Sequence, residues 1–393
     1  MTPVRLVYVA THPYTAFRLM HGQLAYMQRR GFDVATVTAP GPLLDRTAER
    51  EGVRTYEIPM ERSPAPGKDL VSLARLAALF RRLQPAIIYA GTPKAGLLGV
   101  LAGRAARVPT VVYHLRGLRF STATGVTRLA LVTGEHVAAR LADWVFCNSE
   151  SSRREFVARG FVPMARTWIP AHGSSNGVDV ERFEPRPEVR AWANDERRRL
   201  GIADGALVVG FVGRFTRDKG LAELEQALAQ VRARGLSCHL LAVGDFDDTD
   251  PLPADLVARM KSGAGVTVTG YVEEPARHYA MMDLLAFPSY REGFPNAPLE
   301  AAAAGLPTVG FRAVGTVDAV VDGETGTLVP IGDVEGLAGA LERYARDAGL
   351  RARHGAAARG RVRTLFRREV VWEALAAKFE ELAANGARKG RPR

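Results

Sequence analysis

The sequence predicts an α/β protein in which two doubly wound, Rossmann-like domains face a central cleft. Short β-branched or apolar runs alternate with helical patterns along the whole chain, which is the βαβ signature of a parallel sheet. An irregular stretch rich in Gly, Ser, Asn and Pro, residues 170–187, divides these runs into two series. Because ligands of doubly wound sheets bind beyond the carboxyl ends of the strands, the loops that follow strands are where we expect the chemistry.

The first series predicts five strands, at residues 4–10, 32–38, 86–90, 110–114 and 144–148. A helix is expected between residues 69 and 83, because apolar side chains recur there at steps of three and four. These side chains are Leu70, Leu73, Leu76, Phe80 and Leu83.

The second series predicts strands at residues 206–213, 238–244, 266–270, 284–289 and 307–311, with helical segments between them. Two domains of about 180 residues each follow from the two series, a size that is ordinary for one hydrophobic core.

The composition is that of a folded protein with excess positive charge. Of 393 residues, 47% are hydrophobic and 24% charged, which excludes disorder as the main state. The 53 Lys and Arg against 42 Asp and Glu leave a net charge of +11, so an anionic partner is expected. The excess lies in residues 1–178, with 23 basic and 11 acidic residues, and in 351–393, with 12 and 4. Residues 179–350 hold 18 basic and 27 acidic residues.

Cysteine content and hydropathy bound the location of the protein. Cys147 and Cys238 have no spacing for a disulfide framework or a zinc site, which favours a reducing compartment. No run reaches the roughly 18–20 apolar residues of a membrane-spanning helix, and the first apolar run is too short for a signal peptide. We therefore expect a cytoplasmic protein that can lie on a membrane surface.

The loop after the strand at 206–213 carries the first candidate motif, GRFTRDKG. Its glycines permit close approach of the backbone, while Arg214, Lys219 and the N-terminus of the next helix can all face one anion. Phosphate is the ligand that this combination favours, and a solvated loop with two exposed cations is the alternative. The residue order is not that of a Walker A loop.

The second motif, REGFPNAPLEAAAAG, leaves the strand at 284–289 and enters a short helix. Glu292 lies in the loop, and Glu300 is expected in the first turn of the helix. The two carboxylates would then flank a helix N-terminus whose free amides attract a diphosphate or donate to hydroxyl groups. For Glu300 alone, compensation of the helix dipole is the alternative.

Arg214, Lys219, Glu292 and Glu300, each near the end of a predicted strand, resemble the donor site of the retaining GT-B glycosyltransferases, specifically glycosyltransferase family four. The resemblance extends over most of the chain. It implies an acceptor-side domain at residues 1–178, a nucleotide-sugar donor domain at 179–365 and a C-terminal helix with a basic tail, residues 366–393, that returns toward the N-terminal domain. Other matching pieces are GSSNGVDVERF at 173–183, Gly244-Asp245, the turn at 270–272 and DGETGTLVP at 322–330.

The resemblance assigns roles on the donor side. It implies that Arg214 and Lys219 hold the donor diphosphate, that Glu300 binds the nucleotide ribose, and that Glu292 contacts the donor sugar and supports catalysis. The base is expected near the turn of Tyr271 and Val272. Further donor-binding residues are Gly293, Phe294, Pro295 and Asn296.

The resemblance also implies that no metal and no cofactor are needed, the nucleotide-sugar being a co-substrate. The run Asp245-Phe246-Asp247 has the letters of a DxD metal motif, yet it follows the Gly-Asp turn of the family, and we expect a loop or capping role for it.

The N-terminal half resembles the family branch that extends sugars on polyprenyl-diphosphate carriers in capsule, O-antigen, exopolysaccharide and other glycan-block assembly. Where many relatives carry a His-Gly pair, this chain reads Arg116-Gly117, with His114 two residues earlier. Either Arg116 or His114 is therefore the expected catalytic residue that meets the donor sugar. His12 and Lys94 each follow a predicted strand and are candidate acceptor-binding residues, with plain surface positions as the alternative.

The leading prediction is thus a retaining, metal-independent glycosyltransferase that moves a hexose or N-acetylhexosamine from a UDP-sugar to a lipid-linked saccharide. It would lie on the inner face of the cell membrane, with an anionic membrane surface and no nucleic acid among its partners. A basic nucleic-acid-binding protein is the alternative from another class, although the sequence has no helix-turn-helix or zinc-finger motif. A sugar-nucleotide epimerase or phosphorylase of the same fold is the third.

Overall fold

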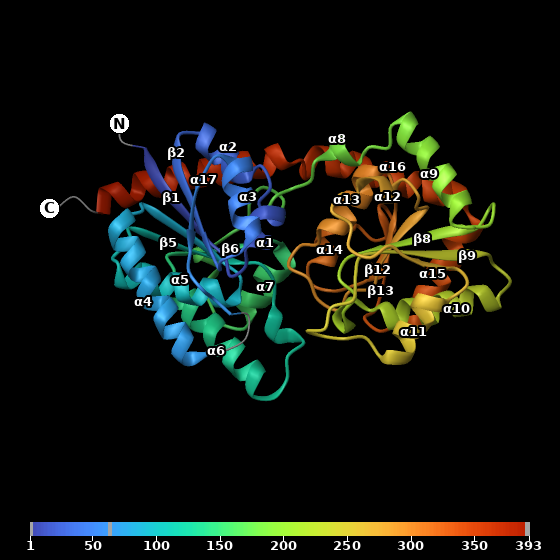
Figure 1. Cartoon of the computed structure of the whole chain (residues 1–393), viewed down its shortest axis with the longest axis horizontal. Coiled ribbons are helices and arrows are strands. Elements are labelled where there is room, and N and C mark those ends of the chain that lie inside the picture. The colour runs from blue at the N-terminus through green and yellow to red at the C-terminus, as the bar shows by residue number, and fades with distance from the viewer. Residues whose placement is uncertain (1–2, 62–64, 390–393) are drawn as a thin grey trace. The chain divides into compact units, whose positions relative to one another are not determined.

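The computed structural model describes residues 3–61 and 65–389. The chain forms two compact units (Figure 1). Unit 1 comprises residues 1–177 together with 368–393, and unit 2 comprises residues 178–367. The chain therefore passes from one unit to the other twice, once at Gly177–Val178 and again at Arg367–Arg368.

Unit 1 is built on a seven-stranded parallel sheet with the strand order β3-β2-β1-β4-β5-β6-β7. The order reverses between β1 and β4, as in doubly wound sheets. The strands are β1 (Val4–Val9), β2 (Phe32–Thr38), β3 (Arg54–Glu57), β4 (Ile87–Gly91), β5 (Thr110–Leu115), β6 (Trp144–Cys147) and β7 (Thr167–Trp168).

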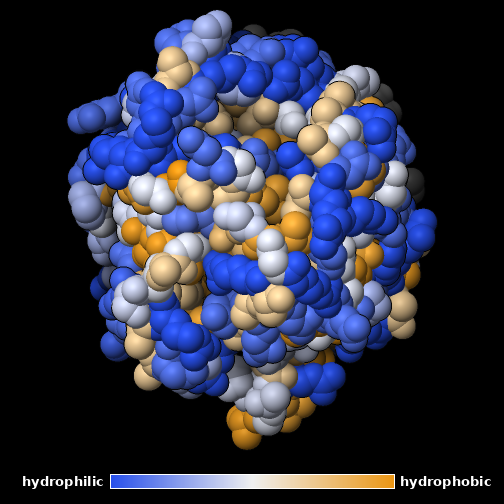
Figure 2. Space-filling view, turned by 90° about the vertical axis from the view of Figure 1, so that its right-hand side faces the viewer, coloured by the Kyte–Doolittle hydropathy of each residue, from blue (hydrophilic) through white to orange (hydrophobic). Residues whose placement is uncertain are grey.

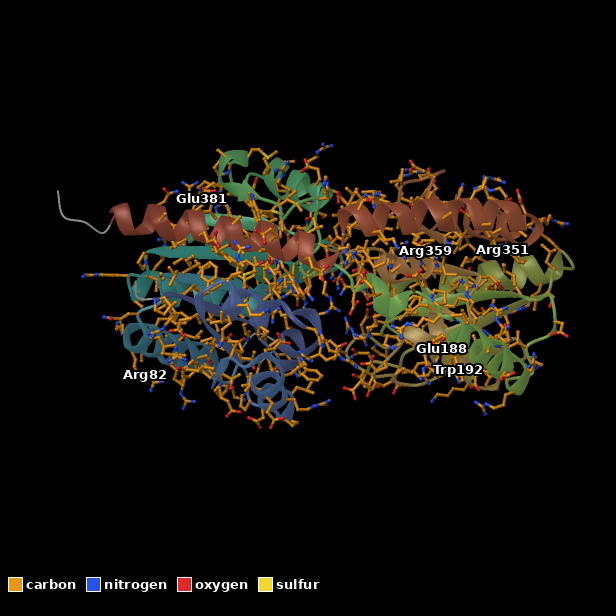
Figure 3. All side chains as sticks on the ribbon, turned by 90° about the horizontal axis from the view of Figure 1, so that it is seen from above. Arg82, Glu188, Trp192, Arg351, Arg359 and Glu381 are labelled. Carbon is orange, nitrogen blue, oxygen red and sulfur yellow. The ribbon has the colours of Figure 1, made fainter. Side chains whose placement is uncertain are left out.

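Helices cover both faces of this sheet, and one of them comes from the C-terminal end of the chain. The helix α17 packs Val371, Leu375 and Phe379 into a cluster with Tyr8 and Tyr89 of the sheet. Figure 3 shows α17, with Glu381 labelled, lying along the sheet of unit 1. On the other face α5 packs between α4 and α6. The helices are α1 (Pro13–Leu19), α2 (Gln23–Arg29), α3 (Pro42–Glu51), α4 (Pro66–Leu83), α5 (Pro93–Ala105), α6 (Gly125–Leu141), α7 (Glu150–Ala158) and α17 (Arg368–Lys389).

Unit 2 repeats the same logic in a six-stranded parallel sheet of order β10-β9-β8-β11-β12-β13, which reverses between β8 and β11. Its strands are mostly buried, as expected for a parallel sheet covered on both faces. The strands are β8 (Leu207–Val212), β9 (Cys238–Val243), β10 (Val266–Val268), β11 (Leu284–Phe287), β12 (Thr308–Phe311) and β13 (Gly326–Val329).

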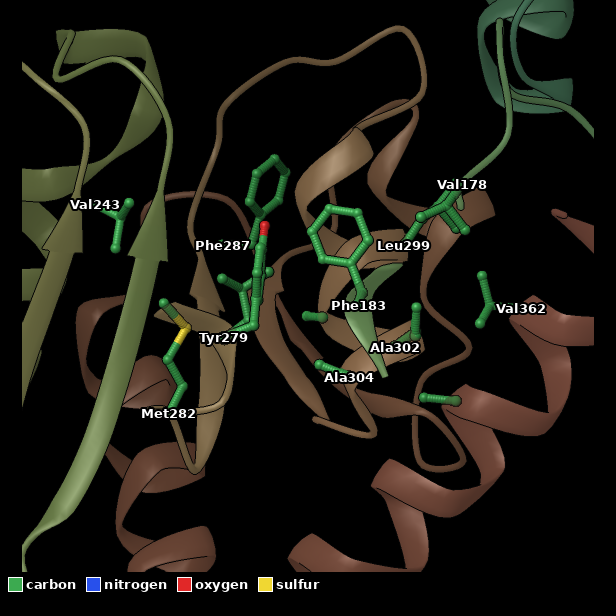
Figure 4. Packing of buried hydrophobic residues seen from close by; sticks show 14 of the residues in the cluster. Val178, Phe183, Val243, Tyr279, Met282, Phe287, Leu299, Ala302, Ala304 and Val362 are labelled. Carbon is green, nitrogen blue, oxygen red and sulfur yellow. The ribbon is translucent and has the colours of Figure 1, made fainter. Parts of the chain in front are cut away.

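Two hydrophobic clusters hold the helices of unit 2 on its sheet. One lies under α8, α12, α13 and α16 and contains Phe183, Tyr279 and Leu299 (Figure 4). The other lies under α10, α11 and α15. The helices are α8 (Val180–Phe183), α9 (Pro187–Arg199), α10 (Leu221–Ala233), α11 (Ala254–Ser262), α12 (Ala276–Tyr279), α13 (Asn296–Ala304), α14 (Thr316–Ala319), α15 (Val334–Arg346) and α16 (Ala348–Leu365).

The predicted fold class is confirmed, and its departures from the prediction have simple causes. Strands β3, β7 and β13 lack the continuous apolar runs by which the others were predicted. The edge strand β3 exposes both of its end residues, Arg54 and Glu57. The apolar pattern of α4 includes Leu70, which is 67% exposed.

The face of unit 2 shown in Figure 2 is mainly hydrophilic, with apolar residues scattered over it. Within residues 3–61 and 65–389, no helix combines the length and the hydropathy needed to cross a lipid bilayer.

Candidate active site

The strongest candidate site lies where the strand order of unit 2 reverses. The loops after β8 and β11 meet there, and they bring together Lys219 and Glu292, which sequence spacing alone could not place. Lys219 Nζ lies 2.5 Å from Glu292 Oε1, and Ser289 Oγ donates to the same oxygen at 2.8 Å. Only 18% of the Lys219 side chain and 15% of the Glu292 side chain are exposed. The two predicted residues thus form one preassembled, partly desolvated ion pair.

A second ion pair fixes the same two loops. Arg291 Nη2 lies 2.8 Å from Asp218 Oδ2, and Thr216 Oγ1 donates to Asp218 Oδ1 at 2.6 Å. Burial acts to raise the pKa of Asp218, but Lys219, Thr216 and Arg291 outweigh it and hold that pKa below its usual value. Asp218 therefore stays ionised and anchors the loop that presents Lys219.

The glycine that ends the GRFTRDKG motif has a steric role. Gly220 has a φ of +70°, and a Cβ built there would lie 2.1 Å from the Pro288 carbonyl oxygen. A side chain at this position would push the loop after β8 away from the loop after β11. Gly220 therefore permits the close approach on which the Lys219–Glu292 pair depends.

Arg214, the other predicted phosphate ligand, lies on the exposed side of the same loop. Its Nη1 lies 2.6 Å from Asp247 Oδ2, and 57% of its side chain is exposed. The hydrogen bond from the Thr249 side chain, together with the Thr249 amide and Arg214, lowers the pKa of Asp247 to about 2. The Asp245-Phe246-Asp247 run thus caps a turn and pairs with Arg214.

The loop before α13 offers backbone donors. Within the described residues, the amides of Gly293, Phe294, Asn296 and Ala297 donate no hydrogen bond. The Phe294 side chain is buried and packs against Phe366, at 5.2 Å between ring centroids, so this residue can present only its backbone to a ligand. Pro295 is buried and has no N–H, while Asn296 begins the helix.

Glu300 lies one residue further along α13 than we expected. The helix begins at Asn296, and its first turn contains no acidic residue. The Tyr279 hydroxyl donates to Glu300 Oε2 at 2.7 Å, which holds the carboxylate against the buried end of α12. Compensation of the helix dipole therefore does not account for Glu300. Tyr271 is 62% exposed after Gly270, and Val272 packs against the neighbouring hydrophobic cluster.

In unit 1, His114 is buried at the end of β5. Its Nε2 lies 2.6 Å from Asn148 Oδ1, and its ring stacks on Tyr89 with 4.7 Å between centroids. Because Asn148 Oδ1 is a hydrogen-bond acceptor, the ring proton of His114 lies on Nε2. Nδ1 can then accept a hydrogen bond. Burial, helped by the neighbouring Arg116 cation, holds the pKa of His114 well below its usual value, so the ring is neutral.

Arg116 follows directly after β5, and burial lowers the pKa of its guanidinium. Its Nη1 is fully buried and contacts no hydrogen-bond acceptor within the described residues. His12 caps α1, with Nδ1 accepting from the Tyr14 amide at 3.1 Å. Lys94 Nζ lies 2.7 Å from Asp69 Oδ1, so the charge of this candidate acceptor-binding residue is already paired.

Several residues of these arrangements were missed by the sequence reasoning. Ser289 follows β11 and Asn148 follows β6, so the rule that chemistry lies at strand ends could have found both. Asp218, which pairs with Arg291, and Tyr279, which donates to Glu300, carry no comparable signal in the sequence. Their importance comes from contacts between segments that are distant in sequence.

Two other features lie away from these residues. A pocket of about 390 Å³, which Arg197, Arg351 and Asp283 help to line, reaches Leu207, the first residue of β8. It therefore lies at the amino ends of the strands, at the opposite edge of the sheet from Lys219 and Glu292. Among residues 3–61 and 65–389, no group of three or more His, Cys, Asp and Glu side chains could hold a metal ion.

Two doubly wound parallel units, with a charged site at the strand ends of the second, have the architecture of the GT-B fold class, and the family models identify the chain as a glycosyltransferase. The chain belongs to the family described as Glycosyl transferases group 1, which matches residues 206–347, and a Glycosyl transferase 4-like domain matches residues 18–172.

Similar proteins support this assignment along nearly the whole chain. The capsular polysaccharide biosynthesis glycosyltransferase CapM of Staphylococcus aureus is 30% identical over 361 residues, 92% of this chain and 93% of that protein. A GDP-mannose-dependent alpha-mannosyltransferase of Mycobacterium tuberculosis is 29% identical over 79% of each chain. An Escherichia coli galactosyltransferase, named as acting from UDP-Gal on alpha-D-GlcNAc-diphosphoundecaprenol, is 27% identical over 78% of each chain.

The fold has a counterpart among solved structures. Anabaena HepE in complex with UDP-glucose superposes with a TM-score of 0.80 and 23% identity, covering 96% of this chain and 99% of that one.

Proposed function

We propose that this glycosyltransferase transfers a sugar from a UDP-sugar to a polyprenyl-diphosphate-linked saccharide during surface polysaccharide synthesis. Transfer would retain the anomeric configuration and need no metal ion. The observation that carries the proposal is the Lys219–Glu292 ion pair beside the free amides of the loop before α13. The similarity to CapM and to the diphosphoundecaprenol-dependent galactosyltransferase supports the acceptor class.

Unit 2 is the proposed donor unit. Lys219, Arg214 and the amides between Gly293 and Ala297 would surround the diphosphate with positive charge, which stabilises it as it leaves. This is the part that Mg²⁺ plays in other transferases. Glu300, held by Tyr279, would accept from the ribose hydroxyls, and the base would lie against the turn at Tyr271 and Val272.

The contacts of Glu292 indicate which role this carboxylate would have in the transfer reaction. Because Lys219 and Ser289 both engage this carboxylate, we assign it a positioning and electrostatic role rather than nucleophilic attack on the anomeric carbon. Retention would then follow from attack of the acceptor hydroxyl on the face that the diphosphate leaves, with a diphosphate oxygen taking the proton. In unit 1, His114 or Arg116 would bind a saccharide substrate.

Donor binding and turnover test this proposal directly. Calorimetry with UDP, GDP and their common sugars should show selective binding of UDP, which raises the free energy of unfolding. Transfer to a synthetic polyprenyl-diphosphate saccharide should persist in EDTA and give a product whose anomeric configuration, read by NMR, equals that of the donor. Inversion, or activity restored only by Mg²⁺ or Mn²⁺, would refute the mechanism. Stronger binding of GDP would refute the assignment of the base.

Unit 1 is the proposed membrane-facing unit. Its net charge is +14, from 29 Lys and Arg against 15 Asp and Glu. The N-terminal half of α6 exposes Val126 by 84% and Leu129 by 67%, with Arg128 exposed between them. Exposed apolar side chains flanked by cations suit the interface of an anionic bilayer, where each nearby cation contributes about 1 kcal/mol. We place the enzyme peripherally on the cytoplasmic face.

Binding to lipid vesicles tests whether the exposed side chains of α6 contact a membrane. The double variant Val126→Glu, Leu129→Glu should lose most binding to vesicles containing phosphatidylglycerol while keeping its affinity for UDP. The matched control is Ile331→Glu, because Ile331 is an exposed apolar residue of unit 2, at 48%. Equal vesicle binding by the double variant and the control would show that α6 does not contribute to membrane binding.

A further inference from the structure

Arg116 is an unusual arginine in this chain. Atoms of three other arginine side chains are also buried without a hydrogen-bond partner, but each of those side chains forms an ion pair through another atom. These are Arg153 with Glu150, Arg291 with Asp218 and Arg359 with Glu184. The Arg116 guanidinium makes no ion pair and no hydrogen bond within the described residues.

Arg116 is partly buried, and a cation that is partly removed from water without a counter-charge opposes folding. Tyr89 is the titratable neighbour that favours the charged form of Arg116, but burial raises the pKa of Tyr89 and keeps its hydroxyl neutral. Among residues 3–61 and 65–389, no acidic side chain therefore offsets the charge of Arg116. A group of this kind is suited to an anion that arrives with a ligand.

The surroundings of Arg116 narrow the kind of anion. A Cβ built on Gly91, at the end of β4, would lie 3.3 Å from Arg116 Cδ and 3.3 Å from His114 Nδ1. His114 Nδ1 is itself buried and without a donor. The Arg116 side chain and the neutral acceptor His114 Nδ1 thus both pack against Gly91, and, in addition to burial, the Arg116 charge is close enough to lower the pKa of His114. One guanidinium fork matches one planar carboxylate in charge and shape, and the ring nitrogen can accept from a hydroxyl beside it.

We propose that Arg116 binds the carboxylate of a uronic acid, so that one saccharide substrate of this enzyme is an acidic sugar. The inference rests on the proposed function and deepens it by naming the substrate class. The carboxylate can come from the donor sugar or from the terminal sugar of the acceptor, and both place the same group at the same fork.

Paired substrates test the proposal, because members of a pair differ at C6 alone. In the donor arm, kcat/KM is measured for UDP-glucuronate against UDP-glucose and for UDP-galacturonate against UDP-galactose. In the acceptor arm, lipid-linked saccharides ending in glucuronate and in glucose are compared. The wild-type enzyme should favour the acidic member at least tenfold in one arm, which identifies the source. Equal rates in both arms would overturn the proposal.

Variants show whether the preference belongs to Arg116. Arg116→Gln should bring the ratio of acidic to neutral substrate close to 1, mainly by slowing the acidic one. The matched control Arg75→Gln, at an exposed position of α4, should keep the wild-type ratio. A uniform loss with both members of the pair would assign Arg116 a general role and overturn its part in selectivity.

Two further readouts separate the possible failures. The Tm of ligand-free Arg116→Gln should equal or exceed that of the wild type, because an uncompensated charge is removed; a lowered Tm would show that the fold needs this arginine and would overturn the proposal. Binding of UDP alone should be the same in both proteins. If UDP fails to bind the wild type, the proposed function fails, independently of Arg116.

Discussion

The two units share a topology but differ in the polar groups that join their loops where the strand order reverses. At the strand-order reversal of unit 2, charges are paired within the fold: Lys219 with Glu292 and Arg291 with Asp218. At the reversal of unit 1, the loops after β1 and β4 are joined by two hydroxyls, Thr11 Oγ1 and Thr92 Oγ1, 2.6 Å apart. The same crevice of a doubly wound sheet can thus be equipped for different ligands.

The difference extends to charge. Within the part of the chain that the structure describes, unit 1 holds the partly buried Arg116 without an acidic partner and the buried Glu135 with the Tyr113 hydroxyl as its hydrogen-bond partner. The net charge of unit 1 is +14. Unit 2 carries 24 Lys and Arg against 27 Asp and Glu, a net charge of −3. We interpret unit 2 as preassembled for its ligand and unit 1 as holding desolvated groups that a substrate must complete.

The largest effect should come from breaking the ion pair of unit 2. Lys219→Met removes a cation proposed to face the leaving diphosphate, and kcat/KM should fall by about 10²–10³-fold. Steady-state kinetics with the UDP-sugar that the binding screen identifies measures this change. Lys261→Met, at an exposed lysine of α11, is the matched control. A loss below tenfold would mean that the pair is structural only.

The buried carboxyl of Glu135, in unit 1, should make stability fall as pH rises. Burial raises the pKa of Glu135 from 4.5 to about 7, although the Tyr113 hydrogen bond acts against it. Because the folded-state pKa lies above the unfolded one, the contribution is complete below about pH 4.5 and is lost as pH rises through 7, by at most about 3 kcal/mol.

Urea unfolding at pH 5 and pH 8 checks this prediction. Glu135→Gln should remove much of the decline in the free energy of unfolding between these pH values. Glu57→Gln, at an exposed position of β3, should leave the decline as in the wild type. Parallel curves for wild type and Glu135→Gln would contradict the raised pKa.

Comparing two glycines of unit 2 measures how much stability depends on the close approach of the loops after β8 and β11. Gly220 and Gly235 have φ values of +70° and +78°, but a Cβ would meet the Pro288 oxygen at Gly220 and nothing within 4 Å at Gly235. Alanine at either site costs about 1 kcal/mol for its left-handed backbone. At Gly220 about 2 kcal/mol more is expected from the clash. Chemical denaturation measures both, and equal costs would show that the loops can separate freely.

The smallest effect should come from removing the hydrogen bond that holds Glu300. Tyr279→Phe removes one hydrogen bond of 2.7 Å to the carboxylate and should raise KM for the donor about fivefold, equivalent to about 1 kcal/mol. The value of kcat should change little, because the ribose lies away from the bond that breaks. Tyr344→Phe, at a buried tyrosine of α15, serves as control. An unchanged KM would show that donor binding by Glu300 does not depend on its hydrogen bond with Tyr279.

Sequence reasoning reached the fold class and the residues that carry charge, because both depend on local patterns. Apolar runs mark buried parallel strands such as β8, and the rule of strand ends picks out Lys219 and Glu292. It could not reach Asp218 with Arg291 or Tyr279 with Glu300, because these contacts depend on which loops the sheet order brings together. It also could not show that Arg116 lacks a partner, since an unmade contact leaves no pattern in a sequence.

The return of α17 to unit 1 has a consequence for how the chain is made. Unit 2 is one continuous segment, whereas the core of unit 1 needs Val371, Leu375 and Phe379, which follow all of unit 2 in the chain. During synthesis, unit 2 is complete while unit 1 still exposes the face of β1 and β4 that these residues cover. The first domain to begin is therefore the last to finish, and a ribosome that stops near residue 367 releases a chain in which unit 2 is complete and unit 1 lacks part of its core.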